Sequence, residues 1–94
     1  MKDLKPIGGL LRNVLEELNL WDELQQCHIL RDWDDIVGEK IAPYARPFKF
    51  ENGELWIRVE DSIWRSEIFN IREALLATIN EKLGERTVRK IWIK

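Results

Sequence analysis

Residues 48–59, with the sequence FKFENGELWIRV, decide the fold that we expect for this chain. Asn52-Gly53 lies between two stretches in which apolar and polar residues alternate, a pattern typical of a β-hairpin closed by a type I′ turn. A two-residue turn fixes the register of the hairpin, so Phe48 should lie opposite Ile57. The nearer pairs are Glu51 with Glu54 and Phe50 with Leu55.

The two faces of this hairpin differ in chemistry because successive strand residues point to opposite sides. The apolar face holds Phe48, Phe50, Leu55, Ile57 and Val59. The opposite face holds Lys49, Trp56 and Arg58. Pro47 lacks an amide donor, so its strand is expected at an edge of the sheet or to pair late.

A third strand is predicted over residues 87–94, where alternation returns. Ile91 and Ile93 should point to the apolar side. The opposite side should carry Val88, Lys90, Trp92 and Lys94.

Three helices are expected around these strands. The first is an amphipathic helix whose apolar stripe comprises Leu4, Ile7, Leu11, Val14 and Leu18, widened by Leu10 and Leu15. In the second, Asp22 is the expected N-cap and Gln25 completes a capping box. Its buried side should consist of Leu24, Ile29, Leu30, Trp33, Ile36 and Val37, and Gly38 closes or interrupts it.

The third helix should be capped by Asp61 or Ser62 and end before Gly84. Its apolar stripe comprises Trp64, Ile68, Ile71, Leu75 and Ile79. The resulting order, ααββαβ, predicts one α+β domain over residues 1–94, with helices packed on one face of a three-stranded sheet and the other face open.

Composition favours an ordinary globular protein, with 45% apolar and 34% charged residues. The net charge of −2 does not indicate a strongly basic nucleic-acid binder, so such a contact would need a local patch. Cys27 is the single cysteine, and the sequence contains neither an apolar run long enough for a membrane span nor a signal peptide at its start. We therefore expect a cytoplasmic protein without a membrane contact.

Motifs for catalysis and cofactor binding are missing from the sequence. It contains no CxxC, HExxH, GxGxxG or P-loop, and adjacent Cys27 and His28 point about 100° apart on a helix. We expect no enzyme activity, no metal and no cofactor. The neighbouring acids Asp32, Asp34 and Asp35 should form a solvated helix side, or else a negative patch for a basic partner.

The open sheet face is the first candidate binding surface. It should gather Lys49, Trp56, Arg58, Lys90, Trp92 and Lys94. Aromatic rings among cations suit single-stranded nucleic acid, because bases stack on the rings and phosphates pair with the cations. Alternatively, Trp56 and Trp92 pack on a chain end, on a dimer partner or on each other.

A ridge along the third helix is the second candidate surface. It comprises Arg65, Phe69, Arg72 and Leu76, and could receive a helix of a partner protein. Alternatively, the two apolar residues cover the rim of the core while the arginine stems lie over them.

The chain also resembles a known family, the DciA proteins. Residues 33–47, with Trp33, Val37, Gly38 and Pro47, are similar to the family's W-x-x-V-V-G…A…T-x-P stretch. Residues 53–67 are similar to its G-x-L-x-V-x-V-x-S-x-x-W-x-x-E-L stretch, and residues 79–91 fit its tail. The resemblance spans residues 10–94.

This resemblance implies a K-homology-like fold and a partner, the DnaB-type replicative helicase, which such proteins help to load or operate without an ATP site of their own. It also implies contact with single-stranded or forked DNA. The GxxG loop of K-homology domains is missing from the sequence. Two alternatives stay open, a general single-strand nucleic-acid binder and a weakly self-associating scaffold. Trp64 is expected in the core at the corner between sheet and helix.

Overall fold

The fold is known from a computed structural model, which describes residues 8–84 and 87–94. The elements are α1 (Gly8–Glu17), α2 (Trp21–Arg31), α3 (Trp33–Val37), β1 (Arg46–Glu51), β2 (Glu54–Arg58), α4 (Ser62–Asn70), α5 (Arg72–Leu83) and β3 (Lys90–Ile93).

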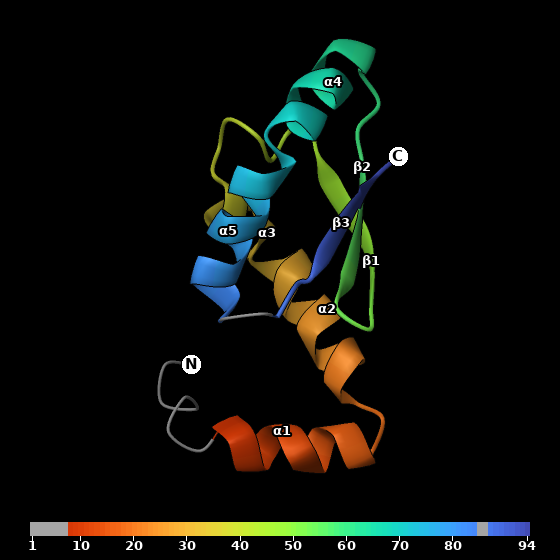
Figure 1. The fold of residues 1–94 in the computed structure, drawn as a ribbon, viewed down its shortest axis with the longest axis vertical. Coiled ribbons are helices and arrows are strands. Elements are labelled where there is room, and N and C mark those ends of the chain that lie inside the picture. Colours follow the sequence, from red (N-terminus) through yellow and green to blue (C-terminus); the bar gives the residue numbers. More distant parts are fainter. Residues whose placement is uncertain (1–7, 85–86) are drawn as a thin grey trace.

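The three strands form one mixed sheet in the order β1-β2-β3. β1 and β2 are antiparallel neighbours, whereas β3 runs parallel to β2 after the crossover through α4 and α5. In Figure 1, α2, α3 and α5 lie together on one side of this sheet. The predicted α+β class, with helices on one face of a three-stranded sheet, is confirmed. The likeness to a K-homology fold stays a prediction.

The hairpin turn has the predicted geometry, but the strand before it does not. Asn52 and Gly53 both have positive φ, 52° and 79°, as a type I′ turn requires. The predicted pairing of Phe48 with Ile57 is wrong, because a β-bulge places Pro47 opposite Ile57 instead. Phe48 is the extra residue of the bulge, and its side chain is 40% exposed. Buried Pro47 takes the core position that the alternation assigned to Phe48.

Two of the predicted helices are each divided by one non-helical residue. Asp32 separates α2 from α3, and Ile71 separates α4 from α5, with φ near −100° at both. Each break changes the phase of the apolar stripe. Ile71 is therefore exposed, and Leu24 and Leu30 on α2 are exposed too, so their predicted burial is wrong.

The helix ends follow the predictions in part. Asp61 caps α4, since its Oδ1 accepts hydrogen bonds from the backbone N–H groups of Ile63 and Trp64, both at 2.9 Å. Gly84 follows α5 with a φ of 121°. Asp22 is not an N-cap, because α2 begins one residue earlier and the Asp22 carboxylate accepts instead from the N–H of Asn52 at 3.1 Å.

The core lies between the helices and the inner face of the sheet. Trp33 is 1% exposed and donates its indole N–H to the carbonyl oxygen of Ala45 at 2.6 Å. Val88 is buried, so its predicted place on the outer face with Lys90 is wrong. The reason is that β3 begins only at Lys90, and Val88 belongs to the segment that enters the sheet. The largest fully buried side chains are those of Trp33, Ile29, Leu55, Ile57, Ile68, Ile79, Val59 and Val88.

The apolar stripe of α1 is not buried by the residues that the structure describes. Leu10, Val14 and Leu18 are 72%, 45% and 60% exposed, and Figure 1 shows α1 at one end of the molecule, away from the sheet. Leu4 and Ile7, which the stripe was expected to include, lie outside the described residues. No helix in the described ranges is long and apolar enough to cross a membrane.

A candidate nucleic-acid interface on the outer sheet face

The six residues of the first candidate surface gather on the side of the sheet opposite the helices. Register explains this, because Trp56 pairs with Lys49 of β1 on one side and with Trp92 of β3 on the other. Alternation along the same strands places Arg58 and Lys90 on this face, and Lys94 follows at the end of β3. We call this surface, made of Lys49, Trp56, Arg58, Lys90, Trp92 and Lys94, the outer face.

The two indole rings lie side by side at the centre of the outer face. Their centroids are 6.4 Å apart and their planes differ by 16°. A lysine ammonium lies over each ring, with Lys49 Nζ 4.8 Å from the centroid of Trp56 and Lys90 Nζ 3.9 Å from that of Trp92. Lys94 Nζ approaches Trp92 as well, at 5.7 Å. Both rings are half-buried, so the described residues leave part of each ring open to solvent.

Glu54 is a functional candidate that the sequence analysis missed. Its Oε1 accepts a hydrogen bond from the indole N–H of Trp92 at 2.6 Å, which fixes the orientation of that ring. Alternation along β2 places Glu54 on the same face as Trp56, and this position could have been predicted from the hairpin register. Glu51 adds a second carboxylate, 3.8 Å from Lys49 Nζ.

The bulge brings a third aromatic ring to this face. The guanidinium carbon of Arg58 lies 4.9 Å from the ring centroid of Phe48, in cation–π range. Alternation alone assigned Phe48 to the core, so its position was missed. Pro47 was the available signal, because proline within a strand often accompanies a bulge.

The outer face is positive although the chain is not. Lys49, Arg58, Lys90 and Lys94 provide four cations, against the carboxylates of Glu51 and Glu54, whereas the chain has a net charge of −2. A phosphate chain would therefore meet a locally favourable surface on a protein that repels it elsewhere.

The second candidate surface is not one continuous ridge, since the break at Ile71 divides it between α4 and α5. Arg65 is engaged within the fold, and its guanidinium donates to the carbonyl oxygen of Val59 at 2.8 and 3.0 Å. The guanidinium of Arg72 stacks 4.1 Å over the ring of Phe69, which is exposed. Leu76 is half-buried against the core.

Trp64 lies at the corner between β2 and α4 and is half-buried rather than enclosed. Its indole packs against the core and stacks on the ring of Tyr44, with centroids 4.2 Å apart and planes 9° from parallel. The prediction that Trp64 belongs to the core is therefore confirmed only in part.

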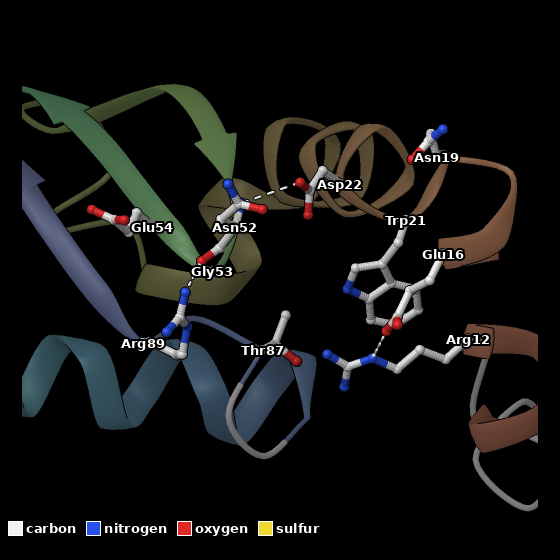
Figure 2. Close-up of a pocket in the computed structure, with 10 residues that line it drawn as sticks. All are labelled: Arg12, Glu16, Asn19, Trp21, Asp22, Asn52, Gly53, Glu54, Thr87 and Arg89. Carbon is white, nitrogen blue, oxygen red and sulfur yellow. Dashed lines mark hydrogen bonds and ion pairs between the residues drawn. The ribbon is translucent and has the colours of Figure 1, made fainter.

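A polar cleft of about 730 Å³ lies beyond the hairpin turn, between that turn and α1 (Figure 2). The guanidinium of Arg12 lies 4.6 Å over the ring of Trp21 and pairs with Glu16 at 2.6 Å. The other arginine, Arg89, donates to the carbonyl oxygen of Asn52. Both arginines already have partners and three carboxylates line the same cleft, so it offers no net attraction for phosphate. The lining residues are Arg12, Glu16, Asn19, Trp21, Asp22, Asn52, Gly53, Glu54, Thr87 and Arg89.

The acidic neighbours near the α2–α3 break are mostly paired. Asp32 contacts Arg31 and His28, and the hydrogen bond from Arg31 holds the pKa of the Asp32 carboxyl below its ordinary value. Asp34 lies 3.4 Å from the guanidinium of Arg46. Across residues 8–84 and 87–94, no group of three His, Cys, Asp or Glu side chains is placed to hold a metal ion.

The fold and the outer face define a class of small α+β proteins in which one sheet face packs under helices and the other presents rings and cations. The chain belongs to the DciA family, described as Dna[CI] antecedent, whose family model matches residues 6–93.

Relatives support this assignment. A UPF0232 protein of Mycobacterium tuberculosis (strain ATCC 25618 / H37Rv) is 27% identical over 93 residues, which cover 99% of this chain and 50% of the relative. A UPF0232 protein of Rhodococcus jostii (strain RHA1) is 25% identical over 92 residues, covering 98% and 49%. The chain thus spans about half the length of the curated relatives it matches.

Proposed function

We propose that this chain is an ATP-independent adaptor that helps load or operate the DnaB-type replicative helicase on DNA in the cytoplasm. Membership of the DciA family supports the helicase as partner. The lack of a P-loop in the sequence supports an adaptor that uses no ATP of its own.

We further propose that the adaptor holds single-stranded DNA on its outer face. The observation that carries this is the pair Trp56 and Trp92, lying side by side with a lysine over each ring. A cation–π contact at an exposed site contributes about 0.5–1 kcal/mol, whereas a stacked base contributes about 1–3 kcal/mol. A base can therefore displace the lysine, whose ammonium then reaches a phosphate a few bonds away.

Tryptophan emission tests the DNA contact. We expect quenching when oligo-dT is added at low salt, and we expect added salt to reverse it. Trp56→Ala and Trp92→Ala should each weaken binding about tenfold or more, as expected for the loss of a stacked base. Lys40→Ala is a matched control for Lys49→Ala, because Lys40 is exposed but lies between α3 and β1, outside the outer face. Tryptophan emission that stays unchanged when oligo-dT is added at low salt would contradict the proposed DNA contact.

The helicase partner needs its own test. We expect the chain to capture the replicative helicase of its host in a pull-down. If no helicase is captured at protein concentrations of roughly tens of micromolar, the adaptor role is contradicted. DNA binding without helicase capture would favour the general single-strand binder. Sedimentation tests the scaffold alternative, which requires the chain to form dimers or larger oligomers at high concentration.

A further inference from the structure

The two outer edges of the sheet differ in whether their outward backbone groups have hydrogen-bond partners. At the β1 edge, α2 supplies acceptors to backbone amides that point away from β2. Gln26 Oε1 accepts from the N–H of Phe50 at 2.9 Å, and Asp22 Oδ2 accepts from the N–H of Asn52 at 3.1 Å. α2 therefore occupies the end of this edge next to the turn.

The β3 edge carries no such cover from the residues that the structure describes. In a parallel pair, alternate residues bond to the neighbouring strand. Lys90 and Lys94 donate to the carbonyl oxygens of Gly53 and Ile57, at 3.3 and 2.9 Å. By this alternation the N–H and C=O groups of Ile91 and Ile93 point to the outer edge, where they meet no hydrogen-bond partner within residues 8–84 and 87–94.

A groove lies beside the first residues of β3, between this strand and α5. Its volume is about 170 Å³ and its lining combines apolar and charged side chains. Half-buried Leu76 and buried Ile91 are the apolar contributors. The cations of Arg72 and Lys90 outnumber the carboxylate of Glu73, while the guanidinium of Arg89 turns to the Asn52 carbonyl. The lining residues are Arg72, Glu73, Leu76, Arg89, Lys90 and Ile91.

We propose that this groove binds an extended, acidic peptide segment of another protein, which adds a fourth strand to the sheet beside β3. Backbone hydrogen bonds to Ile91 and Ile93 would supply affinity. Alternate side chains of the added strand would point toward the groove, where an apolar side chain can reach Leu76. The excess of basic side chains at the rim favours acidic residues in the segment.

A second copy of this chain is a poorer occupant of the edge. Closed two-fold symmetry requires the two β3 strands to run antiparallel. In the register that pairs the outward backbone groups of Ile91 with those of Ile93 in the other copy, Lys90 of each copy lies opposite Lys94 of the other. Like charges directly opposite one another destabilise such a pair. The edge is also distinct from the outer face, with which it shares only Lys90, so the two sites can be tested separately.

Amide hydrogen exchange in the ¹⁵N-labelled chain tests the proposal with two capped decapeptides, one alternating Glu with Val and one alternating Lys with Val. In the free chain, the amides of Trp92 and Lys94 should exchange slowly and those of Ile91 and Ile93 quickly. Of these four amides, the acidic peptide should slow the exchange of Ile91 and Ile93 only. The basic peptide should leave all four unchanged.

Two variants sharpen the test. Ile93→Pro removes one outward N–H but no bond to β2, as proline at an edge allows, and should abolish binding of the acidic peptide. Arg72→Glu should weaken it about fivefold, whereas Lys82→Glu, the same charge change elsewhere on α5, should not. The exchange pattern of the unaltered chain decides the question if Ile93→Pro does not fold.

Three results would overturn the proposal. One is no saturable binding of the acidic peptide. Another is equal binding of the acidic and basic peptides. The third is slow exchange of Ile91 and Ile93 that appears without peptide and grows with protein concentration, which would make this edge an interface between copies of the chain.

Discussion

The side-chain amide of Asn80 on α5 hydrogen-bonds both backbone groups of Val88. It donates to the carbonyl oxygen and accepts from the N–H, each at 2.8 Å. These two bonds fix the segment that enters β3, the strand in which Trp92 faces outward. Val88 itself is buried, so its backbone has little access to water.

Replacing Asn80 by Ala should destabilise the fold. Both backbone groups of Val88 lose their partner, and each buried group left unsatisfied costs about 1–3 kcal/mol. Urea unfolding followed by far-UV circular dichroism measures the change. Asn13→Ala on the exposed side of α1 is the control and should cause no loss. Equal unfolding free energies for wild type and Asn80→Ala would show that water replaces the side chain.

The stacked pair Tyr44 and Trp64 should be coupled energetically. Parallel rings with centroids 4.2 Å apart are expected to contribute about 0.5–1.5 kcal/mol beyond their separate burial. A double-mutant cycle with Tyr44→Ala and Trp64→Ala, measured by urea unfolding, isolates this coupling. Additive effects of the two single changes would contradict a contribution from the stack.

Replacing Glu54 by Gln should strengthen binding of oligo-dT about threefold, because it removes one negative charge from the outer face. The gain is small because a single charge pair near the protein surface contributes less than about 1 kcal/mol. The Gln side-chain oxygen can still accept from the indole N–H of Trp92, so the ring should keep its orientation. Fluorescence titration measures the change. Glu23→Gln on α2 removes the same charge elsewhere and should leave the affinity for oligo-dT unchanged. An equal gain in affinity in both variants would mean that the net charge of the chain, and not the outer face, causes the effect.

Salt dependence should count the cations of the outer face. If Lys49, Arg58, Lys90 and Lys94 each neutralise one phosphate of single-stranded DNA, the logarithm of the binding constant should fall with the logarithm of salt concentration at a slope of about −3. Lys94→Ala should reduce the slope by about 0.7. Titrations at four salt concentrations provide the measurement. A slope that Lys94→Ala leaves unchanged would mean that Lys94 contacts no phosphate.

Substitution of Leu10 should hardly change stability, although sequence periodicity placed it in an apolar stripe. Its side chain is 72% exposed, so Leu10→Gln should alter the unfolding free energy by less than about 0.5 kcal/mol. Ile29→Ala, at a site 1% exposed, should cost about 2–5 kcal/mol in the same urea titration. A loss of similar size in both variants would mean that α1 is covered in solution.

Alternation placed the residues of the outer face correctly, because it is a short-range rule, whereas their role as a binding site stays a prediction. Once the Asn52-Gly53 turn set the hairpin register, period two placed Lys49, Trp56 and Arg58 on one face. The β3 residues joined them because β3 pairs in parallel with β2, and the sequence indicated the strand without specifying its first residue.

Local sequence determined whatever depends on the conformation of one or two residues: the positive φ of Asn52 and Gly53, the Asp61 cap and the stop at Gly84. Tertiary packing decided the bulge at Phe48, the helix break at Ile71 and, among the described residues, the exposure of Leu10, Val14 and Leu18 on α1. The physical reason is that an apolar side chain gains free energy only where the rest of the chain encloses it. Its position therefore depends on distant partners that no local pattern contains.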